Sequence, residues 1–95
     1  MGLRAYLLIN VKDEIDQEDF VNALREVEEI PGVEFVDPVI GSHDMVVTLH
    51  APNTVEAVTD KIHDHHWFRD MKVLKLINLF ELLGKGKRRL SSLPL

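Results

Sequence analysis

The chain has 95 residues, a formal net charge of −5 and no cysteine. A chain of this length forms one domain with a small core, and without cysteine it has no disulfide framework, thiolate nucleophile or cysteine-held metal site. No apolar run approaches the ~20 residues of a membrane span, and no cleavage site follows the short apolar run near the N-terminus. We therefore expect a cytoplasmic protein without a membrane anchor or signal peptide.

The charge is unevenly distributed along the chain. Residues 84–95 combine glycine and serine with four basic residues, which is typical of a flexible basic tail. Because this tail carries +4, residues 1–83 carry −9. An acidic body repels phosphates, so we expect no direct DNA binding by the folded domain 1–83. The tail is open to two interpretations, a solvated segment or a weak phosphate- or partner-binding arm.

Residues 3–12 alternate between apolar and polar side chains, which predicts a strand with one buried face. Asp16, with two acidic residues soon after it, is a suitable N-cap for a helix. Apolar residues recur at helical spacing between Phe20 and Ile30 and form the buried stripe of that helix. Pro31-Gly32 is expected to end it.

Two strands and a turn follow. Residues 33–40 predict a strand, and Pro38 places it at a sheet edge because proline cannot donate to a ladder. Gly41 to Asp44 predict a turn, and residues 45–51, rich in β-branched side chains, predict the next strand. Asn53 and Glu56 form a capping pattern for a second helix, which is expected to end near His66-Trp67. Its buried stripe is expected to consist of Val55, Val58 and Ile62.

The last predicted strand, residues 71–82, is apolar on both faces. One face can cover the helices, whereas an antiparallel sheet facing water would carry polar residues on the other. Tyr6 and Leu8 give the first strand an apolar outer side as well. An apolar sheet face predicts a homodimer packed sheet to sheet.

The element order is strand, helix, strand, strand, helix, strand. Two β-α-β units with right-handed crossovers give an α+β, ferredoxin-like βαββαβ sandwich, a four-stranded antiparallel sheet with both helices on one face.

Few residues suggest catalysis or metal binding. His63 and His66 share a helix face and could bind a metal with Asp60 or Asp64, but histidines in a last helical turn also interact favourably with the helix dipole. We expect no metal and no cofactor. His50, His43 and Tyr6 could act as acid or base in a cleft beneath the sheet, which leaves a small enzyme as an alternative.

The turn Gly41-Ser42-His43-Asp44 is a candidate binding loop. Glycine allows close backbone approach, so amide groups can meet a carboxylate, and Asp44 could accept from an ammonium group. Such a loop suits a zwitterion. A glycine turn with an aspartate is also common in hairpins that bind nothing.

A longer pattern contains this turn: Ile30-Pro31-Gly32-Val33, a strand, Gly41, and Asp44 before Val46-Val47-Thr48-Leu49. Over about residues 3–82 the chain resembles the effector-binding RAM domain of the Lrp/AsnC family of transcriptional regulators. The chain departs from the family before its last strand, where Arg69-Asp70-Met71 replaces the common Pro-Gly-Val. It also begins directly at the first strand, where family members carry a DNA-binding helix-turn-helix domain.

The resemblance implies a stand-alone RAM-like domain, or a fragment, over residues 1–83. It implies an effector, typically an amino acid, bound at Gly41, Ser42, His43 and Asp44 between subunits. It further implies a homodimer, a higher oligomer, and co-assembly with full-length Lrp/AsnC regulators. The expected function is a regulatory module and not an enzyme; a purely structural assembly domain is the further alternative.

Overall fold

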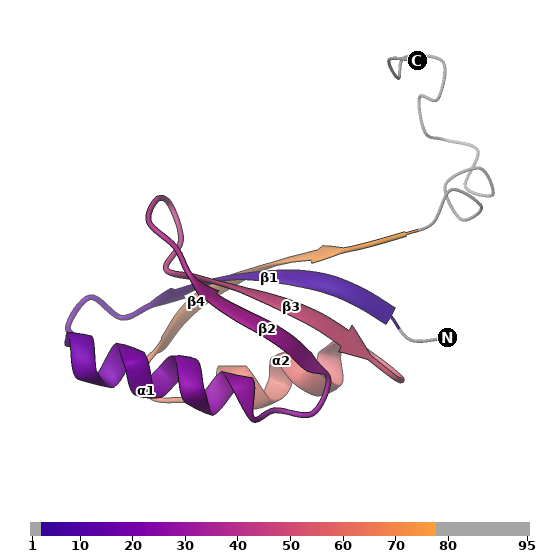
Figure 1. Cartoon of the computed structure of the whole chain (residues 1–95), viewed down its shortest axis with the longest axis horizontal. Coiled ribbons are helices and arrows are strands. Elements are labelled where there is room, and N and C mark those ends of the chain that lie inside the picture. The colour runs from indigo at the N-terminus through magenta and orange to yellow at the C-terminus, as the bar shows by residue number, and fades with distance from the viewer. Residues whose placement is uncertain (1–2, 78–95) are drawn as a thin grey trace, which may run out of the picture.

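A computed structural model describes residues 3–77 of the chain. Six elements follow one another: β1 (Leu3–Val11), α1 (Gln17–Glu28), β2 (Val33–Pro38), β3 (Met45–Ala51), α2 (Glu56–His63) and β4 (Phe68–Lys75). The strands form one antiparallel sheet in the order β2-β3-β1-β4, and both helices cover the same face of it (Figure 1). This is the predicted ferredoxin-like sandwich. The predicted tail 84–95 lies outside the described residues.

The core lies between the sheet and the two helices. In the central strands, Leu7 and Ile9 of β1 pair with Val47 and Met45 of β3, and all four are 0% exposed. Because side chains alternate along a strand, this register sends every second residue of β1 and β3 towards the helices. The helices and the turn before β4 contribute Ala23, Val27, Val55, Val58, Ile62 and Trp67 to the same cluster.

Helix α1 begins as the sequence predicts. The Asp16 carboxylate accepts a hydrogen bond of 2.8 Å from the Asp19 N–H and so caps the first turn. After the helix, Gly32 has φ +100°, a conformation that residues with a Cβ rarely adopt. A Cβ on Gly32 would lie 3.3 Å from Val58 Cγ2. Glycine therefore permits both the turn and its close contact with α2.

Helix α2 differs from its prediction at both ends. Thr54, and not Asn53, supplies the capping oxygen, which accepts from the Ala57 N–H at 3.2 Å. The helix ends at His63 and not near Trp67. Two turns follow it, with hydrogen bonds from the His65 N–H to the Ile62 carbonyl and from the Phe68 N–H to the His65 carbonyl. These turns carry the chain into β4 and leave Trp67 1% exposed.

The edge strands also refine the prediction. β2 lies at the sheet edge, as Pro38 predicts, and its pairing with β3 shifts between Val33 and Phe35. Strand β4 begins at Phe68, three residues earlier than predicted, because Phe68 pairs with Val11 and Asp70 with Asn10, while Arg69 lies between them at a shift in the register. β4 ends at Lys75, so residues 76 and 77 lie outside the strand, contrary to the prediction. The remainder of the predicted strand, residues 78–82, lies outside the described residues.

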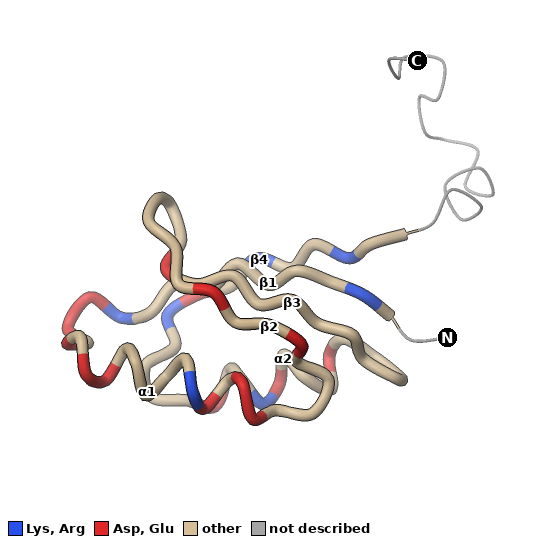
Figure 2. The backbone as a smooth tube through the Cα atoms, in the orientation of Figure 1, with Lys and Arg blue, Asp and Glu red and all other residues tan. Residues whose placement is uncertain are grey.

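The sheet face away from the helices carries one row of side chains that crosses all four strands and contains three large apolar residues beside a threonine. The register aligns Phe35 of β2, Thr48 of β3, Tyr6 of β1 and Leu74 of β4. Phe35 is 63% exposed and Leu74 is 44% exposed. Tyr6 and Leu74 thus lie on the outer face as predicted, whereas the neighbouring rows of the same face also carry Arg4, His50 and Lys72. Acidic residues instead concentrate on α1 and the loop before it (Figure 2).

No helix within residues 3–77 is long and apolar enough to cross a membrane.

Candidate functional site

The hairpin between β2 and β3 extends beyond the sheet and carries the predicted loop Gly41–Asp44 (Figure 1). Gly41 has φ +148°, yet a Cβ at this position would meet nothing within 4 Å. Glycine is therefore favoured here by backbone conformation and not by lack of space. Beyond it, Ser42 Oγ lies 3.1 Å from His43 Nδ1 on the exposed tip.

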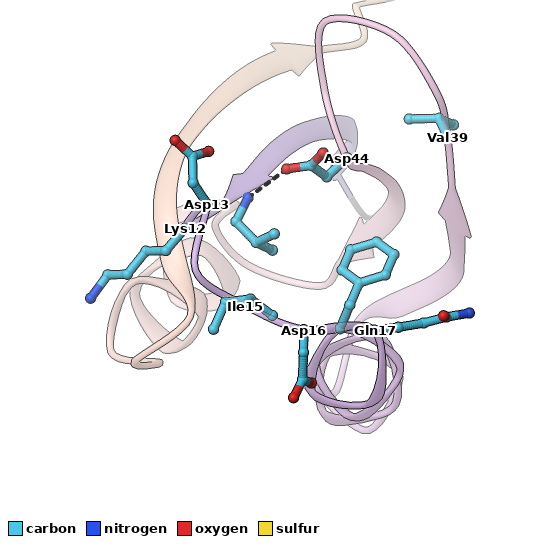
Figure 3. A pocket seen from close by; sticks show the side chains of 9 residues that line it. Lys12, Asp13, Ile15, Asp16, Gln17, Val39 and Asp44 are labelled. Atoms are coloured by element: carbon cyan, nitrogen blue, oxygen red, sulfur yellow. Dashed lines mark hydrogen bonds between the residues drawn. The ribbon is translucent and has the colours of Figure 1, made fainter.

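Asp44 joins the base of this hairpin to β1. Its N–H donates to the Ile9 carbonyl at 2.9 Å, and its carbonyl accepts from the Val39 N–H at 3.0 Å. Its carboxylate oxygen Oδ2 accepts from the Val11 N–H at 2.9 Å (Figure 3). A hydrogen bond to an ionised carboxylate is stronger than one between neutral groups. Asp44 is therefore a structural clamp in addition to its predicted role towards a ligand.

A pocket of about 350 Å³ opens between this hairpin and the turn that leads from β1 into α1. Asp44 and Val39 lie on the hairpin side of it, and Ile15 and Gln17 lie on the α1 side (Figure 3). Four apolar residues and five polar or charged ones line it: Val11, Ile15, Phe20 and Val39, with Lys12, Asp13, Asp16, Gln17 and Asp44.

Only one of the four predicted loop residues lines this pocket. Asp44 does so, whereas Gly41, Ser42 and His43 form the hairpin beyond it and are not part of the lining. The other lining residues were not predicted as site residues. The alternation in β1 marks Val11 as a core residue, and the capping pattern explains Asp16, so neither carries a separate binding signal in the sequence.

A chain of polar contacts orients Asp13 at the pocket mouth. Asn10 Nδ2 donates to Asp70 Oδ1 at 2.9 Å, and Arg69 bridges Asp70 Oδ2 at 3.1 Å and Asp13 Oδ1 at 2.9 Å. The hydrogen bond from Asn10 is the main reason why the pKa of Asp70 lies below its ordinary value, and Arg69 and His43 lower it further. Arg69-Asp70, the departure from the family pattern, thus connects the start of β4 to the β1–α1 turn.

The histidine-rich end of α2 packs against other side chains. His65 Nδ1 lies 3.1 Å from Glu26 Oε2, and its ring stacks on Trp67 with 5.0 Å between centroids. The His63 ring packs on Phe68 at 4.5 Å. In the part of the chain that the structure describes, no group of three His, Asp or Glu side chains is arranged to hold a metal ion.

The three residues considered for acid–base catalysis do not share a cleft. Tyr6 pairs with Thr48 and His50 pairs with Arg4, so both lie on the sheet face away from the helices and not beneath the sheet. His43 lies on the hairpin, at the opposite end of β3 from His50. The structure therefore does not bring these three residues together in the cleft that the enzyme alternative requires.

Solved structures with this fold include transcriptional regulators. An AsnC family transcriptional regulator from Agrobacterium tumefaciens aligns with a TM-score of 0.71 and 16% identity, covering 99% of this chain and 57% of that one. The transcriptional regulator NMB0573 from Neisseria meningitidis, in complex with L-Met, aligns with a TM-score of 0.65 and 21% identity over 99% and 57%. The chain has a RAM-domain-like fold.

The same RAM-domain-like fold occurs in a shorter protein. TTHA0845 from Thermus thermophilus aligns with a TM-score of 0.68 and 20% identity, covering 80% of this chain and 94% of that one. The chain spans little more than half the length of the two regulators. Its alignment covers nearly the whole length of the Thermus protein. No protein-family model matches the sequence, and no curated protein does.

Proposed function

We propose that this chain is a regulatory and oligomerisation module that binds a small molecule, most simply an amino acid, in the pocket beneath the Gly41–Asp44 hairpin. The pocket itself is the observation that carries this proposal. It combines an oriented carboxylate with an apolar wall in a volume of about 350 Å³, within the range of small-ligand sites. The L-Met complex of a regulator with this fold agrees with such a ligand.

The pocket offers separate contacts for the parts of an amino acid. Within residues 3–77, only one Asp44 carboxylate oxygen is hydrogen bonded, so the other can accept from an ammonium group. Gln17 begins α1 on the opposite side. The Asp16 side chain already caps the Asp19 N–H there, and the other N–H groups of the first turn lack intrahelical partners and favour a carboxylate. Phe20 and Val39 provide apolar surface for a side chain.

The outer sheet face supports the oligomerisation part of the proposal. Its apolar row of Phe35, Tyr6 and Leu74 matches the face of a second copy, which gives a two-fold homodimer. The ligand then regulates by binding one assembly state more tightly than another and shifting the population towards it. Full-length Lrp/AsnC regulators that share the fold are the expected partners for mixed assemblies. This function requires no catalytic group.

Thermal unfolding in the presence of each of the twenty amino acids tests the proposal, with mass measured in parallel by light scattering. A ligand that binds only the folded state stabilises it by about 2.7 kcal/mol at a hundredfold excess over its Kd. Trp67 is the only tryptophan and is 1% exposed, so its emission reports unfolding directly.

Asp44→Asn is the informative variant because the amide oxygen can still accept from Val11 while the charge is lost. Asp60→Asn, an exposed position on α2, is the matched control. Loss of the ligand response in the first variant alone supports the proposed site. A panel without any stabilising ligand, or a response unchanged in Asp44→Asn, contradicts it.

A further inference from the structure

The pocket mouth lies in the most acidic segment of the described chain. Residues 12–19, which form the β1–α1 turn and the first turn of α1, contain five carboxylates and one lysine. This net charge of −4 on eight residues compares with −5 for all 95. Figure 2 shows the acidic residues along this loop, at the end of the molecule where the hairpin also begins.

The three carboxylates that line the pocket, those of Asp13, Asp16 and Asp44, do not converge on one point. Asp16 is directed at its own helix, where one oxygen caps the Asp19 N–H. Asp13 is held by Arg69, and Asp44 is held by Val11. In Figure 3 the Asp13 and Asp16 carboxylates point to different sides of the pocket. This geometry suits no chelated ion, but it creates a negative potential over the whole opening.

Cations near the pocket offset only part of this potential. Lys12 lines the pocket, and Arg69 pairs with Asp13. With Arg69 and Asp44 added to the acidic segment 12–19, the net charge around the pocket is still −4. The apolar wall of Phe20 and Val39 accepts an uncharged stem. A ligand with a positive group at the mouth and an aliphatic stem matches both features.

Resting on the proposed function, we propose that this pocket selects ligands with a net positive charge on an aliphatic stem, so that basic amino acids bind more tightly than neutral ones and acidic ones bind most weakly. The selection acts through the field of the acidic segment, and added salt therefore reduces it. Asp44 accounts for binding of the common ammonium group, whereas the acidic segment 12–19, including the lining residues Asp13 and Asp16, accounts for the preference among side chains.

Three ligands of one carbon skeleton test this selection by isothermal titration calorimetry: L-lysine, L-norleucine and L-2-aminoadipate. Unit charges about 4 Å apart in water interact strongly enough for a roughly fivefold change in affinity. We therefore expect L-lysine to bind about fivefold more tightly than L-norleucine and L-2-aminoadipate to bind more weakly than either. The ratio between lysine and norleucine should fall at high salt.

The double variant Glu14→Gln/Glu18→Gln removes two charges from the acidic segment without changing a lining residue. It should reduce the preference for lysine and leave norleucine binding unchanged. Glu28→Gln/Glu29→Gln removes the same charge at the far end of α1, about 16 Å away along the helix, and should leave the preference intact.

The possible failures are distinguishable. If norleucine binds as tightly as lysine, or the two double variants behave alike, the charge selection is wrong while the proposed function stands. If no ligand of the series and no amino acid of the panel binds, the proposed function itself fails.

Discussion

Replacing Asp44 by alanine should destabilise the fold even in the absence of a ligand. The substitution removes the 2.9 Å hydrogen bond from the Val11 N–H to the Asp44 carboxylate, while the two backbone hydrogen bonds of residue 44 need no side chain. Hydrogen bonds to charged groups contribute about 1.5–3 kcal/mol. Val11 is only 9% exposed, so its N–H is poorly placed to recover a full water contact. We expect Asp44→Ala to lower the free energy of unfolding by about 2 kcal/mol.

The asparagine variant separates the lost hydrogen bond from the lost charge. Asp44→Asn keeps a neutral acceptor and should cost less than about 1.5 kcal/mol, the net value of an ordinary hydrogen bond. For a domain of this size, a loss of 1 kcal/mol lowers Tm by about 4–8 °C. Urea unfolding followed by Trp67 emission measures these differences, with Asp60→Ala and Asp60→Asn as controls. If Asp44→Ala unfolds at the same urea concentration as the Asp60 controls, the clamp does not stabilise the hairpin.

Three further predictions concern other parts of the molecule. The double variant Phe35→Asp/Leu74→Asp should convert a sheet-to-sheet dimer to monomers in light scattering. The control Val21→Asp, which charges an apolar residue on α1 that is 38% exposed, should leave the mass unchanged. A dimer that survives the double variant excludes the outer sheet face as the dimer interface. Gly32→Ala should lower the free energy of unfolding in urea by about 1–3 kcal/mol, because it adds backbone strain to a 3.3 Å contact with Val58 Cγ2. Gly41→Ala makes no such contact and should lower it by less. A larger loss of stability at Gly41 would contradict the steric part of this reasoning. The pKa of Glu56 is lowered by backbone hydrogen bonding at the start of α2 and then by Lys75, and the pKa of Asp70 is lowered chiefly by Asn10. The unfolded chain therefore takes up these protons at higher pH than the folded one. The stabilisation from these two groups is complete above the ordinary carboxyl pKa of about 4 and is lost as pH falls below it. The variant Glu56→Gln/Asp70→Asn should lose less stability on acidification, and an unchanged pH profile would exclude these two groups as the source of the acid sensitivity.

Local patterns were sufficient to predict the fold. Alternation determined the buried faces of β1 and β3, and the bounds of β3 were predicted without error. Pro38 correctly predicted that β2 lies at the edge. The missing N–H of proline is a local property, so this prediction does not depend on which distant residues pack nearby. Asp16 was recognised as a cap for the same reason.

Competition between neighbouring residues explains the local errors. Asn53 and Thr54 are both good capping residues, and the choice depends on where the chain leaves β3. Helix α2 stops at His63, and the turns that follow it bury Trp67. This end is set by packing of Trp67 in the core, which helical spacing in the sequence does not indicate. Arg69 and Asp70 resemble a loop in sequence. Asp70 nevertheless pairs with Asn10 in the sheet, and Arg69, at the register shift beside it, is held by Asp13 and Asp70.

The pocket could not be predicted from spacing because its walls come from distant segments. Of the four residues in the Gly41–Asp44 pattern, Asp44 lines this pocket, and its role towards a ligand stays a prediction. The opposite side, Ile15 to Phe20, is brought there by the crossing of α1 under the sheet. The clamp between Asp44 and Val11 joins residues 33 positions apart, and an aspartate that bonds a backbone N–H has no distinguishing signature in the sequence.

The irregular pairing of β2 limits how copies of this protein can join. Exposed strand edges recruit further strands, and a row of such contacts can extend into a fibre without end. On the β2 side, the shifted register near Glu34 and the missing N–H of Pro38 interrupt the regular donor pattern that an incoming strand needs. In the proposed homodimer, by contrast, the two outer sheet faces cover each other once two copies have met. The irregular edge of β2 therefore disfavours open-ended growth on its side and is compatible with the closed assembly that we propose.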